Sequence, residues 1–210
     1  MTGITTGDFD VAVVGAGPAG LAAGIAMAEL GLVTAVIGPP ADPRDGRTAA
    51  LFQSSITFLE RIGAWHAIEP SSARLAAIRL IDATGALFRA PEVTFRASDI
   101  GSPAFGYNVP NAVLTAALET LAAARTTRLH TARVTSIAPS ESGVTLTTAE
   151  GARITCRLAA AADCRQSAGR AAAGIPVKAG LTIRQQSFAR FPIRGRMTRY
   201  RPNFIAAAGR

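Results

Sequence analysis

The sequence predicts an α/β fold with a central parallel sheet, and two stretches of the chain support this prediction. Residues 11–38 read as a strand, a glycine turn, a helix and a second strand, which is a βαβ unit of about 30 residues. Residues 128–161 contain apolar runs separated by turn residues at regular spacing, which is typical of a β-meander. Together the two stretches predict a Rossmann-like domain built from a parallel sheet and a meander.

The glycine turn of the βαβ unit has the pattern G-x-G-x-x-G, at the point where the first strand passes into the helix. Gly15 permits a tight turn, Gly17 removes the Cβ that would keep a diphosphate from the backbone, and Gly20 lets helix and strand pack closely. Free amides and the positive end of the helix dipole favour an anion here. The predicted dinucleotide site therefore consists of Gly15, Ala16, Gly17, Pro18, Ala19 and Gly20.

One part of the dinucleotide pattern is missing at the end of the second strand. An Asp or Glu is expected there, about 20 residues after the glycines, to bind the ribose hydroxyls. The sequence has Gly38 at this position, and Asp42 and Asp45 follow in the next loop. We therefore expect the ribose contact from a backbone group, from water or from one of these two acids.

Other classes of protein are less consistent with the chain. The uncharged run from Val11 to Ala28 reaches the lower limit of a membrane span, about 18 residues, but its glycines and Pro18 would break such a helix. Cys156 and Cys164 lack C-x-x-C spacing and a nearby histidine, which argues against a zinc site or a disulfide scaffold. The first ten residues do not resemble a signal peptide, so we expect a cytoplasmic protein.

The formal net charge of +8 comes from the end of the chain. Residues 1–180 contain 15 Lys and Arg against 14 Asp and Glu, whereas residues 181–210 contain seven Arg and no acid. The excess therefore belongs to the tail, and no nucleic-acid partner is expected for the domain. An arm that binds RNA or lipid headgroups is a further interpretation of the tail, based on charge alone.

The remaining elements follow from periodicity and turn signals. The expected elements are a helix at 49–62 capped by Thr48, strands at 77–82, 86–89 and 93–95 with a turn at 84–85, an extended piece at 107–109, a helix from 111 to about 124, and strands at 128–137, 144–148 and 153–161.

Three further segments, at 47–65, 106–114 and 162–170, follow the glycine turn in a characteristic order. In this order the motifs resemble those of the FAD-dependent aromatic hydroxylases, most closely the UbiH-like ubiquinone-biosynthesis hydroxylases, which are related to p-hydroxybenzoate hydroxylase. The resemblance extends from residue 8 to about 178. It implies an FAD-binding domain of the glutathione-reductase type, formed by residues 1–73 and 105–178, with residues 74–104 contributing to a second, substrate-side β-sheet.

The resemblance also assigns roles to three residues outside the glycine turn. Arg47 matches an arginine on the adenosine or diphosphate side of FAD, and its alternative is an ordinary loop arginine. Asn111 matches a polar residue near the ribityl and diphosphate groups, and it also suits the N-cap of the following helix. Asp163 matches the aspartate of an Asp-Gly signature, but Cys164 replaces the glycine. A cysteine cannot adopt a positive φ as freely as a glycine, so the resemblance does not fix the exact geometry of this loop.

The implied function is that of an FAD-dependent monooxygenase. FAD reduced by NAD(P)H would activate O₂ for hydroxylation of an aromatic ring, here a polyprenylated phenol of ubiquinone biosynthesis. Neither a catalytic side chain nor a metal is expected, and the sequence gives no indication of the oligomeric state. Peripheral association with the inner membrane is inferred only from the hydrophobicity of this substrate class. The alternatives are another FAD-dependent oxidoreductase and a non-catalytic remnant that binds a flavin or another nucleotide.

After Lys178 the resemblance ends, and residues 179–210 read as an aberrant or disordered basic tail. We hypothesise a shifted reading frame followed by early termination, because plausible codons for residues 188–210 spell family-like segments in another frame. A naturally divergent tail is the alternative, and the nucleotide sequence distinguishes the two. Because a later Gly-Asp signature of the family is not reached, we expect weak binding of the ADP half of FAD and no hydroxylation by the isolated chain.

Overall fold

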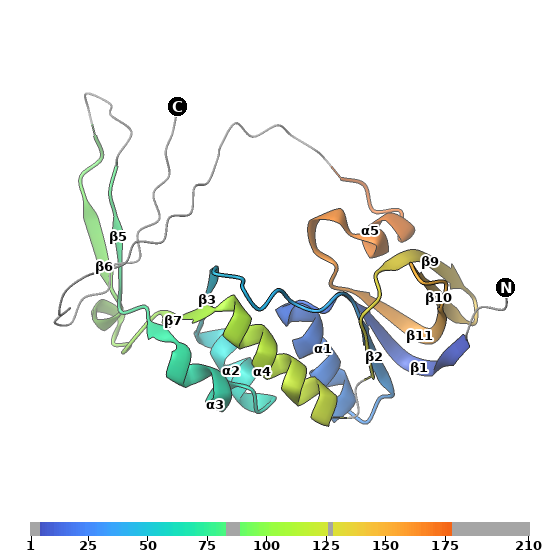
Figure 1. Ribbon diagram of the computed structural model, residues 1–210. Coiled ribbons are helices and arrows are strands. Elements are labelled where there is room, and N and C mark those ends of the chain that lie inside the picture. The colour runs from blue at the N-terminus through green and yellow to red at the C-terminus, as the bar shows by residue number, and fades with distance from the viewer. Residues whose placement is uncertain (1–4, 83–88, 126–127, 178–210) are drawn as a thin grey trace. The chain divides into compact units, whose positions relative to one another are not determined.

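The computed structural model describes residues 5–82, 89–125 and 128–177, and the chain divides into two units (Figure 1). The first unit comprises Met1–Ala73 and Asn108–Val177, and the second includes Arg74–Tyr107. The basic tail lies outside the described residues, as does most of the strand predicted at 86–89. The functional assignment of the two units remains a prediction from the resemblance.

A six-stranded mixed sheet forms the centre of the first unit, in the order β8-β2-β1-β11-β10-β9. Its strands are β1 (Thr5–Val14), β2 (Thr34–Ile37), β8 (Arg128–His130), β9 (Val134–Ser140), β10 (Gly143–Thr148) and β11 (Arg153–Ala161). Strands β8, β2, β1 and β11 are parallel, whereas β10 and β9 continue the sheet as antiparallel strands. The predicted α/β fold of a parallel sheet with a β-meander is confirmed.

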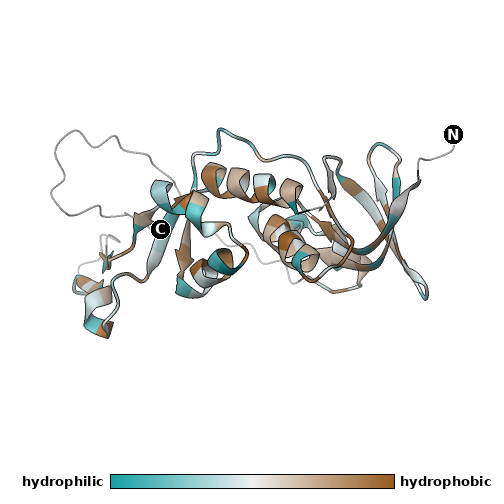
Figure 2. Cartoon of the chain, turned by 90° about the horizontal axis from the view of Figure 1, so that it is seen from below, coloured by the Kyte–Doolittle hydropathy of each residue, from teal (hydrophilic) through white to brown (hydrophobic). Residues whose placement is uncertain are grey.

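Residues 11–14 of strand β1 are buried, as their unbroken apolar run predicts. Ala12 and Val14 belong to a core cluster that includes Leu146 and Ile154 of the meander. Helix α1 (Pro18–Glu29) packs against β1 and β2 and buries Leu21 completely. Figure 2 shows hydrophobic positions, in brown, along both the helices and the strands of the chain. The glycine turn therefore connects a buried strand to a helix that packs against the same sheet.

Helix α4 (Asn111–Ala124) packs against α1 and begins and ends where its sequence predicts. An ion pair between Glu29 Oε1 and Arg125 Nη1, at 2.6 Å, connects the carboxyl ends of the two helices. The remaining helices of the first unit are α2 (Gln53–Arg61), α3 (Trp65–Ile68) and α5 (Ala168–Ala172), with short 3₁₀ turns at η1 (Glu69–Ser71) and η3 (Cys164–Gln166). No helix of the described residues has the length and apolarity needed to cross a bilayer.

Two predicted elements are wrong in their type or number. The helix expected at 49–62 is strand β3 (Thr48–Phe52) followed by α2, and Phe52 rather than Thr48 occupies the N-cap. Strand β3 joins β7 (Gly106–Pro110) and β4 (Ala73–Arg74) in a sheet of order β3-β7-β4, so pairing overrides the helical period. The single strand expected at 128–137 is two strands, β8 and β9, at opposite edges of the central sheet.

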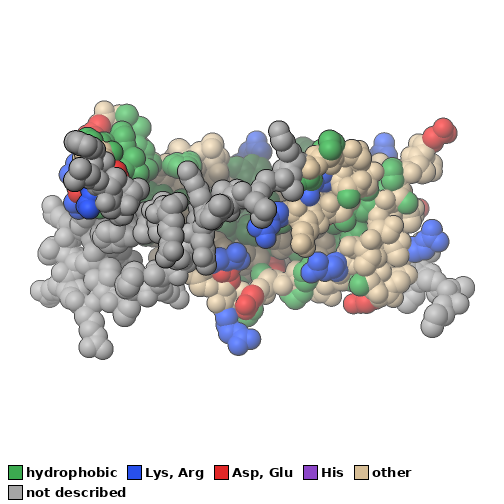
Figure 3. All heavy atoms as spheres, turned by 90° about the horizontal axis from the view of Figure 1, so that it is seen from above, with side chains coloured by type: hydrophobic (Ala, Val, Ile, Leu, Met, Phe, Trp, Pro, Cys, Tyr) green, Lys and Arg blue, Asp and Glu red, His purple; other side chains and the backbone are tan. Residues whose placement is uncertain are grey.

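The second unit contains an antiparallel pair, β5 (Ala77–Leu80) and β6 (Val93–Arg96), followed by the 3₁₀ turn η2 (Ala97–Ile100). Opposed residues share one face of a sheet, so the pairs Ile78–Phe95 and Leu80–Val93 form one apolar face. These four side chains are 38–56% exposed, and hydrophobic side chains gather over this hairpin in Figure 3. The strand predicted at 93–95 is confirmed, and its partner is the strand predicted at 77–82.

Candidate functional site: a glycine turn beside two polar clusters

The glycine turn lies at the carboxyl ends of the parallel strands β1 and β2. The amide of Gly15 donates to the carbonyl of Ile37 at 2.7 Å, and Gly15 has a φ of +117°, which a residue with a side chain rarely adopts. Gly17 is the N-cap of α1, with φ −75° and ψ 174°. The first amides of α1 therefore start at the edge of the sheet where ligands of open α/β folds bind.

The three glycines of the motif meet different surroundings. A Cβ on Gly15 would lie 2.3 Å from the carbonyl oxygen of Ala162, and one on Gly20 would lie 1.8 Å from the carbonyl oxygen of Gly15. A Cβ on Gly17, by contrast, would meet no atom within 4 Å. Gly15 and Gly20 are therefore required by packing within the chain, whereas the space beside Gly17 is open.

The missing ribose-binding acid has a steric reason. A Cβ on Gly38 would lie 2.5 Å from the backbone nitrogen of Ala16, in the glycine turn itself. Any larger residue at position 38 would push the turn out of place. An acidic side chain is therefore excluded where the dinucleotide pattern normally has one.

Asp163 lies directly beside the glycine turn. The amide of Ala162 donates to the carbonyl of Val14 at 2.7 Å, which aligns the end of β11 with the end of β1. Asp163 Oδ2 accepts from the amides of Ala168 at 2.5 Å and Gly169 at 3.4 Å. Its Oδ1 is buried and has no hydrogen-bond partner among the described residues. The structure therefore places an unused acceptor next to the turn.

The charge of Asp163 is stabilised by its surroundings. Burial by itself would raise the pKa of this carboxyl group, but hydrogen bonds with the Ser167 side chain and the amides of Ala168 and Gly169 outweigh burial and lower the pKa. Asp163 is therefore an anionic acceptor at neutral pH, suited to bind hydroxyl groups.

Cys164 has a φ of +63° and is the only residue other than glycine with a positive φ among those that the structure describes. Its side chain is exposed. The chain thus keeps the left-handed backbone that a glycine would adopt freely, although a cysteine occupies the position.

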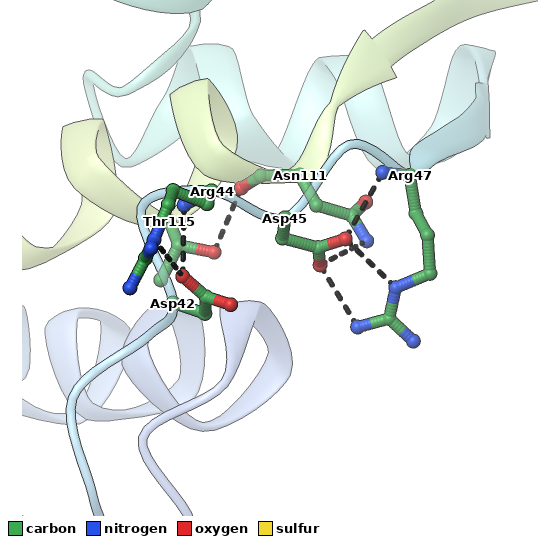
Figure 4. Close-up of polar contacts among 6 residues, drawn as sticks. All are labelled: Asp42, Arg44, Asp45, Arg47, Asn111 and Thr115. Atoms are coloured by element: carbon green, nitrogen blue, oxygen red, sulfur yellow. Dashed lines mark hydrogen bonds and ion pairs between the residues drawn. The ribbon is translucent and has the colours of Figure 1, made fainter. Parts of the chain in front are cut away.

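A second cluster surrounds the carboxylate of Asp45 (Figure 4). Its Oδ1 accepts from the backbone amide of Arg47 at 3.0 Å and from Arg47 Nε at 2.8 Å. Its Oδ2 accepts from Arg47 Nη2 at 2.8 Å and from Asn111 Nδ2 at 3.1 Å. The Arg47 hydrogen bonds, followed by the one from Asn111, hold the pKa of Asp45 well below its usual range, and the same pair raises the pKa of Arg47.

The sequence did not predict how Asp45 interacts. The alternative interpretation of Asn111 as a helix N-cap is wrong, because Pro110 occupies the N-cap and the Asn111 side chain donates to Asp45 instead (Figure 4). The D-G-R turn was the available signal, since an aspartate side chain in a turn commonly accepts from the backbone amide two residues later, here that of Arg47. Asp42, the other candidate acid, accepts from the amide of Arg44 at 2.9 Å.

An apolar cavity of about 720 Å³ lies between the meander and α5, with Asp163 and Cys164 in its wall. Its apolar lining includes Ile137, Val144, Ala159 and Ile175. The volume is in the range of small-molecule sites. Among the described residues, no group of three or more His, Cys, Asp or Glu side chains could hold a metal ion.

Comparisons with known proteins agree on one family. A protein family described as "FAD binding domain" matches residues 8–195. The ubiquinone hydroxylase UbiL of Rhodospirillum rubrum is 32% identical over 189 residues, which cover 85% of this chain and 42% of the relative. The chain therefore spans less than half the length of this curated relative. The family match also continues past residue 178, so the limit that we expected for the resemblance is too early.

Solved structures share the fold. The flavin-dependent monooxygenase PieE, solved with FAD and substrate, is 21% identical with a TM-score of 0.68, over 86% of this chain and 34% of that one. Anhydrotetracycline hydroxylase OxyS from Streptomyces rimosus, 21% identical, has a TM-score of 0.64 over 87% and 36%. The p-nitrophenol 4-monooxygenase PnpA from Pseudomonas putida, 18% identical, has a TM-score of 0.65 over 83% and 44%.

Proposed function

Since the chain belongs to the family of FAD-dependent aromatic hydroxylases and contains its FAD-binding domain, we propose that it binds the FAD diphosphate at the Gly15–Gly20 turn. The observation that carries this proposal is the open space at Gly17, at the N-terminus of a 12-residue helix. Amides at such a terminus donate to an anion, and the helix dipole favours negative charge there. A diphosphate carries the charge and the acceptor oxygens that these amides need.

The polar clusters supply the remaining contacts of the proposed site. Asp163 Oδ1 is buried beside the turn and has no hydrogen-bond partner among the residues that the structure describes, so it would accept a hydroxyl of the ribityl chain. Arg47 would donate to the phosphates or to the adenosine side of FAD. Asn111 is linked to Arg47 because both side chains donate to Asp45 Oδ2. A ribose contact by an acid at position 38 is excluded sterically, so backbone groups, water or Asp42 would provide it.

For the whole protein we propose FAD-dependent hydroxylation of an aromatic ring, with NAD(P)H as the reductant. Bound FAD would supply the redox chemistry with O₂, while this chain's residues bind and orient the cofactor. The relative from Rhodospirillum rubrum is described as a ubiquinone hydroxylase, which supports a polyprenylated phenol as the substrate class. A hydrophobic substrate of this class would partition into the membrane. We therefore propose a cytoplasmic protein that associates peripherally with the inner membrane.

FAD titration of the purified 210-residue chain tests the cofactor proposal. Binding is expected to quench flavin fluorescence, shift the flavin absorption bands and raise the melting temperature with FAD concentration. Binding should fall in high salt, because the diphosphate contact is electrostatic. A protein that is colourless as purified, and whose melting temperature does not change at millimolar FAD, would overturn the proposal.

A second candidate function is FAD binding without hydroxylation by this chain. It is favoured by one observation, that the chain spans only 42% of the curated relative. Oxidation of NADH or NADPH by the FAD-loaded chain, with a short-chain polyprenyl phenol and product analysis, separates the two candidates. Hydroxylated product supports the monooxygenase, whereas FAD binding with no oxidation of either nucleotide supports the second candidate.

A further inference from the structure

We propose that Asp45 is a positioning residue, which holds Arg47 by one edge of its guanidinium group so that the other edge meets a phosphate of the cofactor. The inference rests on the proposed function, because the phosphate belongs to the FAD proposed above. It extends that function to a residue for which the resemblance gave no role of this kind.

The geometry of the pair divides the guanidinium group into two sides. Asp45 accepts from Nε and Nη2 of Arg47, both at 2.8 Å, in the bidentate arrangement that suits a carboxylate. Arginine carries five side-chain N–H groups, so this contact leaves about three of them for another acceptor. The Arg47 side chain is 71% exposed, whereas that of Asp45 is only 18% exposed. The unused donors therefore belong to the accessible partner.

The carboxylate of Asp45 has no remaining capacity to bind a ribose. It accepts four hydrogen bonds, three from Arg47 and one from Asn111. An ionised carboxylate offers about four lone-pair sites, and all of them are used. This excludes Asp45 from the two loop acids considered for the ribose contact, and it leaves orientation of its neighbours as the function of its charge.

The same carboxylate fixes the loop to a helix. Asn111 is the first residue of α4, its side chain donates to Asp45, and its backbone amide donates to the carbonyl of Arg47 at 3.0 Å. Figure 4 shows the Asn111 amide and the Arg47 guanidinium meeting at the Asp45 carboxylate. Arg47 is thus held before any anion arrives, and a preorganised donor loses less conformational freedom on binding.

A competing role would give the opposite result. An aspartate close to an anion site repels the anion, so removal of its charge strengthens binding if orientation is unimportant. If orientation dominates, removal of the charge weakens binding even though a repulsive group has been lost. The sign of the effect of Asp45→Asn on affinity therefore decides between the two roles.

The experiment compares FAD, ADP and adenosine as ligands of the wild type, Asp45→Asn, Arg47→Ala and the double variant. We expect Asp45→Asn to weaken FAD and ADP binding by about tenfold or more, the range for a charged hydrogen bond, and to leave adenosine binding unchanged. In the Arg47→Ala background the same substitution should have no further effect, because Asp45 acts through Arg47. Asp45→Glu keeps the charge but displaces the carboxylate by one methylene, so it should also weaken ADP binding.

Glu29→Gln is the matched control, because it removes a carboxylate from an arginine pair at the carboxyl ends of α1 and α4. It should leave ADP binding unchanged. Tighter ADP binding by Asp45→Asn, an unchanged affinity, or an equal loss in the Arg47→Ala background would overturn the inference. Failure of the wild type to bind FAD would overturn the proposed function and this inference with it, whereas wild-type binding with an unaffected Asp45→Asn variant overturns only the inference.

Discussion

Gly20 and Gly15 are so close that a Cβ on Gly20 would lie 1.8 Å from the carbonyl oxygen of Gly15. The second contact of that Cβ would be the Gly15 carbonyl carbon at 2.9 Å, so the obstruction is backbone and cannot rotate away. The turn between β1 and α1 is therefore folded back on the helix it begins. Its shape depends on the absence of one methyl group.

The first prediction is that Gly20→Ala destabilises the protein by about 3 kcal/mol, the upper range for overpacking a rigid site. In an ordinary helix interior the same substitution stabilises by roughly 0.5–1 kcal/mol, so the expected sign is reversed. Urea unfolding followed by circular dichroism measures the difference. An unchanged or raised free energy of unfolding would show that the close approach of Gly15 and Gly20 is wrong.

Gly17→Ala should behave in the opposite way. Because its Cβ would meet nothing within 4 Å and its φ of −75° suits any residue, we expect a change in unfolding free energy within about 0.5 kcal/mol. FAD affinity should nevertheless fall by at least about tenfold, because the methyl group would occupy the space that the diphosphate needs. Melting curves and FAD titration on one preparation separate these effects, and normal FAD affinity would contradict the assigned site.

The left-handed backbone of Cys164 predicts that a substitution at this position stabilises the protein. At a φ of +63° a side chain is strained by roughly 1–2 kcal/mol, and the greater unfolded-state entropy of glycine offsets about 0.4–1 kcal/mol of any gain. Cys164→Gly should therefore raise the free energy of unfolding by roughly 0.5–1 kcal/mol. Cys164→Ala is the control, because it removes the thiol but keeps the strain. Equal melting temperatures for the glycine and alanine variants would argue against a strained backbone here.

Elements specified by neighbouring residues were predictable from the sequence. Helix α4 begins after Pro110 and follows one apolar period. Strand β11 covers the predicted residues and ends just before Ala162 and Asp163. The glycine turn was found because its pattern lies between a strand and a helix. In each of these cases local preference and tertiary packing favour the same structure.

The remaining features depend on residues far apart in the chain. Strand β3 exists because β7 lies beside it, and β8 and β9 are separate because they pair at opposite edges of one sheet. Asp45 meets Asn111 across 66 residues, and Gly38 is required by the backbone of Ala16. No periodicity or motif within 20 residues contains this information, since it arises only when the strands are assembled.

The two thiols should differ in reactivity. Cys164 is exposed, whereas Cys156 is buried in the core of the sheet, and burial raises the pKa of its thiol. At pH 8 a disulfide reagent should therefore modify one thiol per chain quickly and the second only after denaturation. Cys164→Ala should remove the fast reaction. Rapid modification of both thiols in the native protein would contradict the burial of Cys156.

The last prediction concerns pH. The pKa of Asp163 is lowered below its ordinary value of 3.8 in the folded chain, because its hydrogen bonds outweigh the effect of burial. A carboxyl group of this kind stabilises the fold fully above pH 3.8, and its contribution is lost as the pH falls through the lower, folded-state pKa. The wild type should therefore be more stable than Asp163→Asn at pH 7, and this difference should shrink steadily below about pH 4. Urea unfolding of both proteins between pH 7 and pH 2.5 measures it, with Glu141→Gln, on an exposed turn, as the control for general charge effects. A stability difference that is constant across this range would mean that the Asp163 charge makes no contribution to the loop beside the glycine turn.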